Sequence, residues 1–293
     1  MLQSIRILLT GLIDYAGLFP PAALEMAMAV DNYATYREGA NPWMLGRFVL
    51  PVARLAEFEA AASGRVDATR PWQVSVIAGP DLPQDLDTIA QFNARNDPRI
   101  LIDTIEIKAS APEAIAAALP RLPSELTPYF EIPLEDDLAP LVQTIADGSA
   151  RAKVRTGSTV AEGFPSAAAL ARFIRACADE DVPFKATAGL HHPLRSVQDL
   201  SGQPGSGRAL MHGFLNVFLA AAFAQAGMAT DRLAELLEES DLAAFHFEDD
   251  AVIWWGEMVV KGHLRNTRNL FAISFGSCSF EEPLEDLEKL GLM

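Results

Sequence analysis

Short stretches in which apolar and polar residues alternate recur along the chain, separated by longer stretches with an apolar residue every three or four positions. The first pattern predicts β-strands and the second predicts amphipathic helices. The predicted strands are Leu12–Ala16, Gly46–Val52, Trp72–Ala78, Leu101–Lys108, Thr127–Leu134, Arg151–Gly157, Pro183–Gly189 and Leu270–Gly276. Helices are expected near residues 26–33, 54–62, 86–93, 112–119, 138–145 and 284–290.

The segment from Arg151 to Leu194 contains the clearest β-α-β unit. Ser166 begins a helix between its two strands, with an apolar stripe formed by Leu170, Phe173, Ile174 and Cys177. Strands joined by such a crossover are expected to be parallel neighbours. We therefore expect Lys153 and Lys185 to lie side by side. Repulsion between the two ammonium groups would lower the pKa of one of them and make it a nucleophile toward carbonyl groups.

Eight alternations of strand and helix in 293 residues predict an α/β fold, a single-domain (β/α)8 TIM barrel. The interval between the seventh and eighth strands, residues 195–268, is too long for a loop and predicts a helical and hairpin insertion. It contains the patterns Leu210–Ala226 and Asp231–Ser240, and then Ala244–Trp255, which indicates a hairpin turning at Asp249-Asp250. An alternative remains in which this hairpin supplies the eighth strand.

Composition narrows the range of partners. The formal net charge is −16 and no run of Lys or Arg occurs, which argues against nucleic acid and anionic membranes. Cys177 and Cys278 are the only cysteines, which predicts a cytoplasmic chain without disulfides. The apolar run Ile7–Ile13 is interrupted by Thr10 and Gly11, so a signal peptide is not expected. Leu210–Ala226 is too short and too polar for a membrane span.

The predicted strands carry charged residues on the face opposite their apolar residues. Strands of a parallel barrel are usually continuous apolar runs because both faces are covered, so these charges are unusual. Each buried charge costs several kcal/mol unless it is paired, so a core without a function is not expected to contain so many. If the alternation holds, one cavity contains Asp14, Arg47, Glu106, Lys108, Glu131, Lys153, Arg155 and Lys185. Cations are in slight surplus, which predicts a small anionic or strongly polarised substrate.

Several motifs resemble the deoxyribose-phosphate aldolase family, whose members are class I aldolases on a TIM barrel. The similar segments are Leu12-Ile-Asp-Tyr15, Phe48-Val-Leu-Pro51, Val74-Ser-Val-Ile-Ala-Gly-Pro80, Lys153-Val-Arg-Thr-Gly157, Phe184-Lys-Ala-Thr-Ala-Gly189 and Ile273-Ser-Phe-Gly-Ser-Cys278. The resemblance implies that Lys153 forms a Schiff base and that Lys185 is the second lysine. The family's Gly-Gly phosphate turn is here Ala188-Gly189, so a phosphorylated substrate is not implied.

The first hypothesis is a class I aldolase-like lyase that acts on a small anionic carbonyl compound without a cofactor or metal. Lys153 attacks the carbonyl group, Lys185 tunes its pKa, and Glu106 or Asp14 moves protons. The expected substrate-binding residues are Arg47, Lys108, Glu131, Arg155, Thr187, His191, His192 and Ser277. Residues Gly276 and Ser277 offer backbone N–H groups for an anion. The sequence leaves the subunit count open, a homo-oligomer included.

Two other hypotheses remain open. The first is a metal-dependent TIM-barrel lyase, isomerase or hydrolase that uses His191 and His192, with Glu131, His246 or His263 as further ligands. Adjacent histidines seldom bind one ion, because their side chains diverge. The second is a non-catalytic barrel that binds a ligand or a partner, with Trp254 and Trp255 at an interface.

Overall fold

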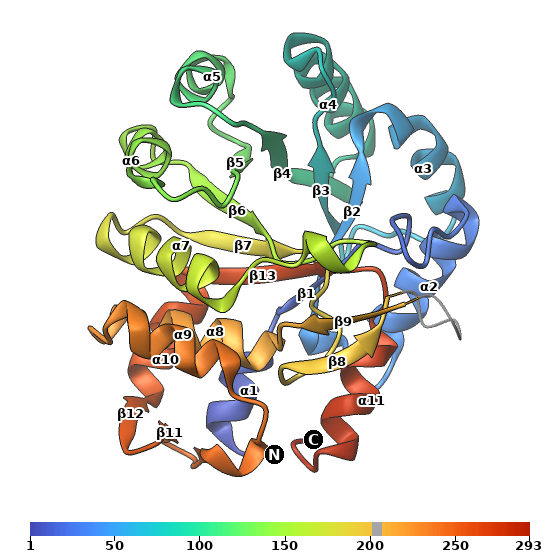
Figure 1. Cartoon of the computed structure of the whole chain (residues 1–293). Coiled ribbons are helices and arrows are strands. Elements are labelled where there is room, and N and C mark those ends of the chain that lie inside the picture. The colour runs from blue at the N-terminus through green and yellow to red at the C-terminus, as the bar shows by residue number, and fades with distance from the viewer. Residues whose placement is uncertain (201–206) are drawn as a thin grey trace.

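The computed structural model describes residues 1–200 and 207–293, and its centre is a closed barrel of parallel strands surrounded by helices (Figure 1). The strands follow one another around the barrel in the order β1-β13-β7-β6-β5-β4-β3-β2. They are β1 (Ile13–Tyr15), β2 (Leu45–Pro51), β3 (Trp72–Ile77), β4 (Ile100–Lys108), β5 (Thr127–Glu131), β6 (Arg151–Arg155), β7 (Phe184–Thr187) and β13 (Ala272–Ser277). The predicted (β/α)8 barrel is confirmed.

Helices cover the outside of the barrel. They are α2 (Met26–Glu38), α3 (Leu55–Ala62), α4 (Leu82–Asn96), α5 (Pro112–Ala118), α6 (Ala139–Asp147), α7 (Ala167–Asp179), α8 (Phe214–Gln225) and α11 (Glu281–Lys289). Short 3-10 turns occur at η1 (Pro42–Met44), η2 (Val52–Arg54), η3 (Leu119–Arg121), η4 (Ala161–Gly163) and η5 (Leu242–Ala244). The core lies between this layer and the outward faces of the strands.

The unit formed by β6, α7 and β7 illustrates how the sequence produces this layering. Ala152 and Val154 are fully buried, while Lys153 between them belongs to the opposite face of the strand. Ser166 caps α7, because its Oγ accepts a hydrogen bond from the backbone N–H of Ala169 at 3.1 Å. The apolar stripe predicted for this helix is completely buried. The strands pair in parallel, with Lys153 opposite Lys185.

The interval between β7 and β13 contains both the expected insertion and a regular barrel helix. A hairpin, β8 (Ser196–Asp199) and β9 (Arg208–Met211), precedes α8, and α9 (Thr230–Glu238) follows it. The predicted hairpin is confirmed as β10 (Phe245–Phe247) and β11 (Ala251–Trp254). A third strand, β12 (Glu257–Val260), extends it into a separate sheet, and α10 (Lys261–Leu270) leads to β13. The alternative that placed this hairpin in the barrel is therefore wrong, since β13 closes it.

A helix at the beginning of the chain, α1 (Gln3–Leu9), was not predicted. Its Ile5, Leu8 and Leu9 are buried, and the helix packs against α10. Arg268 of α10 fastens this contact, because its Nε donates a hydrogen bond to the carbonyl oxygen of Leu8 at 2.8 Å. Within residues 1–200 and 207–293, no helix combines the length and apolar character that crossing a membrane requires.

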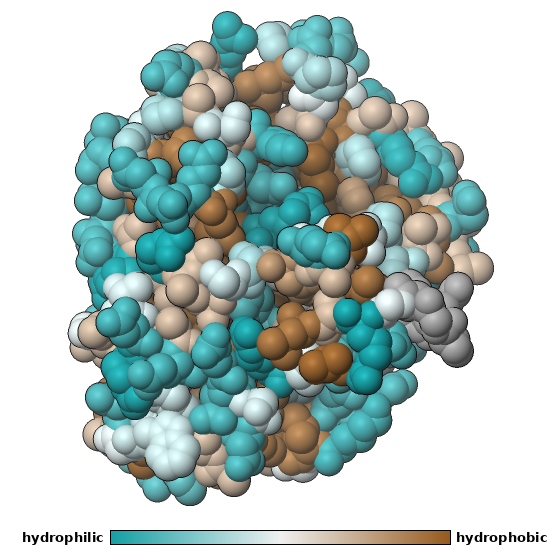
Figure 2. All heavy atoms as spheres, in the orientation of Figure 1, coloured by the Kyte–Doolittle hydropathy of each residue, from teal (hydrophilic) through white to brown (hydrophobic). Residues whose placement is uncertain are grey.

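The face of the molecule in Figure 2 carries hydrophilic residues around most of its rim, and hydrophobic residues are scattered toward its middle. This distribution fits the strongly acidic composition of the chain. The surface is thus of an ordinary kind. The unusual feature of the molecule is the set of charged residues buried inside the barrel, such as Asp14, Glu106, Lys153 and Lys185.

Candidate functional site

A cavity of about 710 Å³ opens at the carboxyl ends of the barrel strands. Strand-end residues such as Lys108 of β4, Thr187 of β7 and Gly276 of β13 lie on its wall. The carboxyl ends of the strands are where active sites occur in TIM barrels. Among the charged residues predicted for the site, the cavity is lined by Glu106, Lys108, Glu131, Lys153, Arg155 and Lys185.

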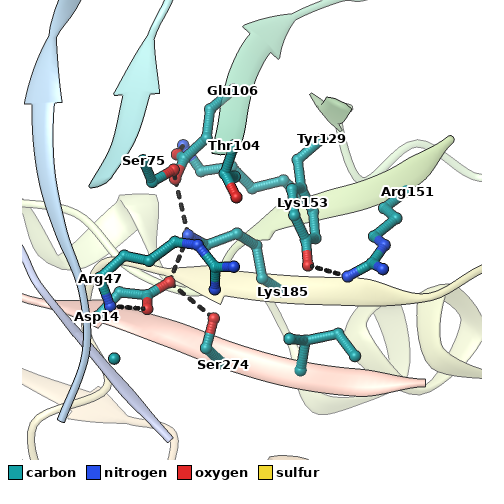
Figure 3. Close-up of polar contacts among 12 residues, drawn as sticks. Asp14, Arg47, Ser75, Thr104, Glu106, Tyr129, Arg151, Lys153, Lys185 and Ser274 are labelled. Carbon is teal, nitrogen blue, oxygen red and sulfur yellow. Dashed lines mark hydrogen bonds and ion pairs between the residues drawn. The ribbon is translucent and has the colours of Figure 1, made fainter. Parts of the chain in front are cut away.

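The two lysines are next to each other, as predicted. Lys153 of β6 and Lys185 of β7 occupy paired positions of neighbouring strands, and the side chains of both are almost completely buried. The close-up in Figure 3 shows both inside the barrel, with Glu106 of β4 nearby. Both side chains still reach the wall of the cavity.

Carboxylates alternate with the ammonium groups in one continuous line. Glu106 bridges the lysines, with its Oε2 at 2.7 Å from Nζ of Lys153 and its Oε1 at 2.7 Å from Nζ of Lys185. Lys185 also binds Oδ2 of Asp14 at 2.6 Å. Lys153 also binds Oε2 of Glu131 at 2.7 Å, and Oε1 of Glu131 lies 3.3 Å from Nε of Arg155. We call these six residues the charge line.

Neutral donors hold the buried carboxylates of the charge line in place. Asp14 accepts hydrogen bonds from Oγ of Ser274 at 2.7 Å and from the backbone N–H of Arg47 at 2.8 Å (Figure 3). Glu106 accepts a hydrogen bond from Oγ of Ser75 at 2.7 Å. A buried charge needs such partners to remain ionised, so this inner end of the site is a fixed ionic structure.

The interposed carboxylates control the pKa of Lys185, and the lysines control that of Glu106. Burial lowers the pKa of Lys185, but Asp14 and Glu106 outweigh it and hold this pKa above its ordinary value. Burial raises the pKa of Glu106, but the two lysines outweigh it and hold this pKa well below its usual range. Lys185 therefore stays protonated near neutral pH and keeps the positive charge that the sequence predicted for the neighbour of Lys153.

Arg47 points into the barrel but is not among the described residues that line the cavity. It forms a bidentate ion pair with Asp103, with Nε and Nη2 at 2.7 and 2.8 Å from the two carboxylate oxygens. Sequence alternation did not identify Asp103, because the register between β3 and β4 shifts between Val74 and Ser75. The carboxylate of Asp103 therefore cancels part of the surplus of positive charge that the sequence predicted for the barrel interior.

The remaining predicted binding residues divide into two groups. Thr187, His191 and His192 lie on the cavity wall with Lys108 and Arg155. Ser277 is buried and is not among the described lining residues, although its neighbours Gly276 and Cys278 are. Lys108 is exposed and forms no ion pair with any residue in the described ranges, so its charge is available to a ligand.

The histidines face acidic residues of α11 that the sequence did not indicate. Nδ1 of His191 lies 3.1 Å from Glu282, and Nδ1 of His192 lies 2.6 Å from Asp286. Glu131, one of the further ligands considered for a metal, is bound to Lys153 and Arg155 instead. Across residues 1–200 and 207–293, no group of three or more His, Cys, Asp or Glu is placed to hold a metal ion. The geometry therefore gives no support to a metal site at His191 and His192.

Two further groups near the site differ in their chemistry. Tyr129 accepts a hydrogen bond at 2.9 Å from Arg151, and Nζ of Lys185 lies over its ring, 5.5 Å from the centroid. Cys278 lies on the cavity wall, but burial raises the pKa of its thiol to about 11. Little thiolate forms near neutral pH, so Cys278 is a poor nucleophile.

No protein-family model matches the chain, and no curated protein is significantly similar to it in sequence. The resemblance to deoxyribose-phosphate aldolases therefore stays a prediction. What the arrangement can do chemically follows from its own parts. It contains an open cavity, amines at its floor, carboxylates that stabilise positive nitrogen, and free cationic charge at its mouth.

Proposed function

We propose that this protein is a Schiff-base carbon–carbon lyase that acts on a small anionic carbonyl compound. The observation that supports this proposal most strongly is the position of Lys153, which is buried between Glu106 and Glu131 and still reaches the cavity. An iminium ion keeps the positive charge of the amine it replaces. Carboxylates that pair with the ammonium group can therefore also stabilise the iminium.

Lys153 is a better candidate nucleophile than Lys185 because of its partners. Lys185 binds Asp14 and Glu106, whose side chains are only 2% and 3% exposed. The second partner of Lys153 is Glu131, which lies on the cavity wall. Glu106 lines the cavity and serves both lysines, so the difference lies in the second partner: Glu131 is 14% exposed, whereas Asp14, the second partner of Lys185, is not among the described lining residues. A proton leaving Lys153 therefore has a further acceptor at the cavity wall.

Glu131 is the proposed proton acceptor. Burial raises its pKa, but Lys153 and Arg155 outweigh it and keep this pKa below the ordinary value while Lys153 is charged. As Lys153 gives up its proton, the larger of the two charges that depress the pKa of Glu131 disappears, and Glu131 becomes more basic. The proton therefore moves from Nζ of Lys153 to the Glu131 carboxylate in contact with it, and the neutral amine then attacks.

The reaction then proceeds without a cofactor. The neutral amine adds to the carbonyl carbon, and loss of water gives the iminium. Cleavage of the neighbouring carbon–carbon bond sends its electron pair to the iminium nitrogen and leaves an enamine, while the hydroxyl proton of the departing aldehyde passes to a base. Protonation of the enamine and hydrolysis release the second product and restore Lys153.

Reductive trapping tests this proposal. The protein is incubated with a panel of small aldehydes and oxo acids and sodium cyanoborohydride, and the modified residue is found by peptide mass spectrometry. We expect an adduct at Lys153 in the wild type and none in Lys153→Arg, which keeps the positive charge but cannot form the imine. Lys261, a lysine outside the barrel, reports background labelling. Equal labelling of Lys153 and Lys261 would rule the proposal out.

A further inference from the structure

A second cavity of about 370 Å³ lies beside the first and has walls in common with it. Lys108, Glu131, Arg155 and Phe164 line both cavities. The rest of the second cavity is formed by the loops that follow β4 and β5 and by η4. A molecule bound at Lys153 therefore has room to extend past this shared wall.

The charges on the shared wall are less neutralised than those at the cavity floor. Lys153 and Lys185 each contact two carboxylates at 2.6–2.7 Å. Arg155 has one ion pair, at 3.3 Å, and its side chain is 53% exposed. Lys108 has no ion pair within residues 1–200 and 207–293. Two cations that line both cavities are thus available to a ligand.

Carboxylates on the same cavity limit how much negative charge it accepts. Glu131 is already shared between Lys153 and Arg155. Glu162 of η4 lines only the second cavity, is exposed, and has no ion pair with a described residue. With Glu131 paired to Lys153, Lys108 and Arg155 exceed the unpaired Glu162 by one positive charge. One carboxylate balances this charge, whereas a dianionic phosphate exceeds it.

The strand register sets the distance between this wall and the reacting nitrogen. Lys108, Glu131 and Lys153 occupy paired positions on three successive strands, β4, β5 and β6. Two strand spacings place the Cα atoms of Lys108 and Lys153 roughly 10 Å apart. An anionic group at Lys108 therefore belongs to a ligand in which a short spacer separates it from the carbon bound to Lys153.

We propose that Lys108 and Arg155 form a subsite for the carboxylate of an oxo acid whose carbonyl group is separated from the carboxylate by a short aliphatic spacer. The carboxylate subsite stands on the two cavities and their charges. The position of the carbonyl group at Lys153 rests on the proposed Schiff-base function. Anion binding and imine formation are therefore measured separately.

Anion binding is measured with butanoate, which cannot form an imine, by ligand-observed NMR titration. We expect Lys108→Ala to weaken binding about tenfold, the factor for loss of one charge-assisted hydrogen bond. Lys108→Arg should keep most of the affinity, and Glu162→Gln should increase it. Arg121→Ala is the matched control, because it removes one exposed positive charge outside both cavities.

Imine formation is measured by cyanoborohydride trapping of the wild type with 4-oxobutanoate and with butanal, which lacks the carboxylate. We expect 4-oxobutanoate to reach half-maximal labelling of Lys153 at about one tenth of the butanal concentration, an advantage lost in Lys108→Ala. Butanoate binding that depends on Lys108, without trapping of either aldehyde, would keep the subsite and reject the Schiff-base function. Equal trapping of both aldehydes, with butanoate binding unchanged in Lys108→Ala, would reject the subsite alone. No trapping of either aldehyde, together with butanoate binding that is unchanged in Lys108→Ala, would reject both the Schiff-base function and the subsite.

Discussion

Replacing Glu106 with Gln tests the charge line at its centre. The amide has nearly the same shape as the carboxylate but no charge. Glu106 is almost completely buried and contacts Lys153, Lys185 and Ser75, each at 2.7 Å. The substitution therefore removes one negative charge from between two buried positive charges, with little change in packing.

The expected cost follows from what remains after the substitution. Breaking a buried ion pair by removing one partner costs about 3–5 kcal/mol, because the other charge is left without compensation. Here Lys153 retains Glu131 and Lys185 retains Asp14. The free energy of unfolding should therefore fall by about 3 kcal/mol at neutral pH, the lower end of that range.

The loss should also depend on pH in a defined direction. The folded-state pKa of Glu106 lies below its ordinary value of 4.5, so its charge stabilises the fold above pH 4.5 and this contribution declines as the pH falls further. The pKa of Lys185 lies above its ordinary value of 10.5, so its charge stabilises the fold below pH 10.5 and this contribution declines above it. The difference between wild type and variant should therefore be greatest between these limits.

Urea unfolding followed by circular dichroism measures the effect at pH 7 and at steps down to pH 3.5. Ser75→Ala is the matched control, since it removes one hydrogen bond to the same carboxylate and should cost about 1 kcal/mol. A loss below 1 kcal/mol for Glu106→Gln, or a loss that does not shrink below pH 4.5, would contradict the reasoning.

Three further predictions concern residues around the site. Arg268→Met should lower the free energy of unfolding by about 3 kcal/mol in urea titrations, because buried backbone carbonyl groups lose their donor; a change under 1 kcal/mol would contradict this. Gly157→Ala should lower the melting temperature and the rate of trapping at Lys153, because a Cβ there would lie 2.6 Å from Cα of Gly189; unchanged values would show that the loops adjust freely. Cys278 should react with iodoacetamide at pH 8 far more slowly than free cysteine, since the pKa of its thiol is raised to about 11; equal rates would disprove that pKa.

The barrel was predictable because its strands repeat one simple pattern. On β6, for example, small apolar residues alternate with basic ones, so the period of two assigns each side chain to a face before any coordinates are known. The α1 helix was missed because its seven residues are too few for a clear helical period and merge with the apolar residues of β1. Strand β12 was missed because only its pairing with β11 distinguishes it from a loop.

The site was predictable in its members but not in its pairing. Alternation indicated Lys153, Lys185 and Glu106, but no sequence rule says that Glu106 lies between the two lysines and neutralises both. Asp103 was missed because a register shift breaks the alternation on which the prediction depends. Glu282 was missed because it reaches the cavity from a helix far along the chain.

The order of the strands along the chain determines when the contacts of the site can form during synthesis. Glu106, Glu131 and Lys153 come from three consecutive strands, so their ion pairs can assemble once the middle of the chain has left the ribosome. The bond between Lys185 and Asp14 joins distant parts of the chain, and the hydroxyl group that donates to Asp14 belongs to Ser274, near the C-terminus. A chain stopped before β13 would lack that donor, so complete assembly of the charge line and its hydrogen bonds waits for the last barrel strand.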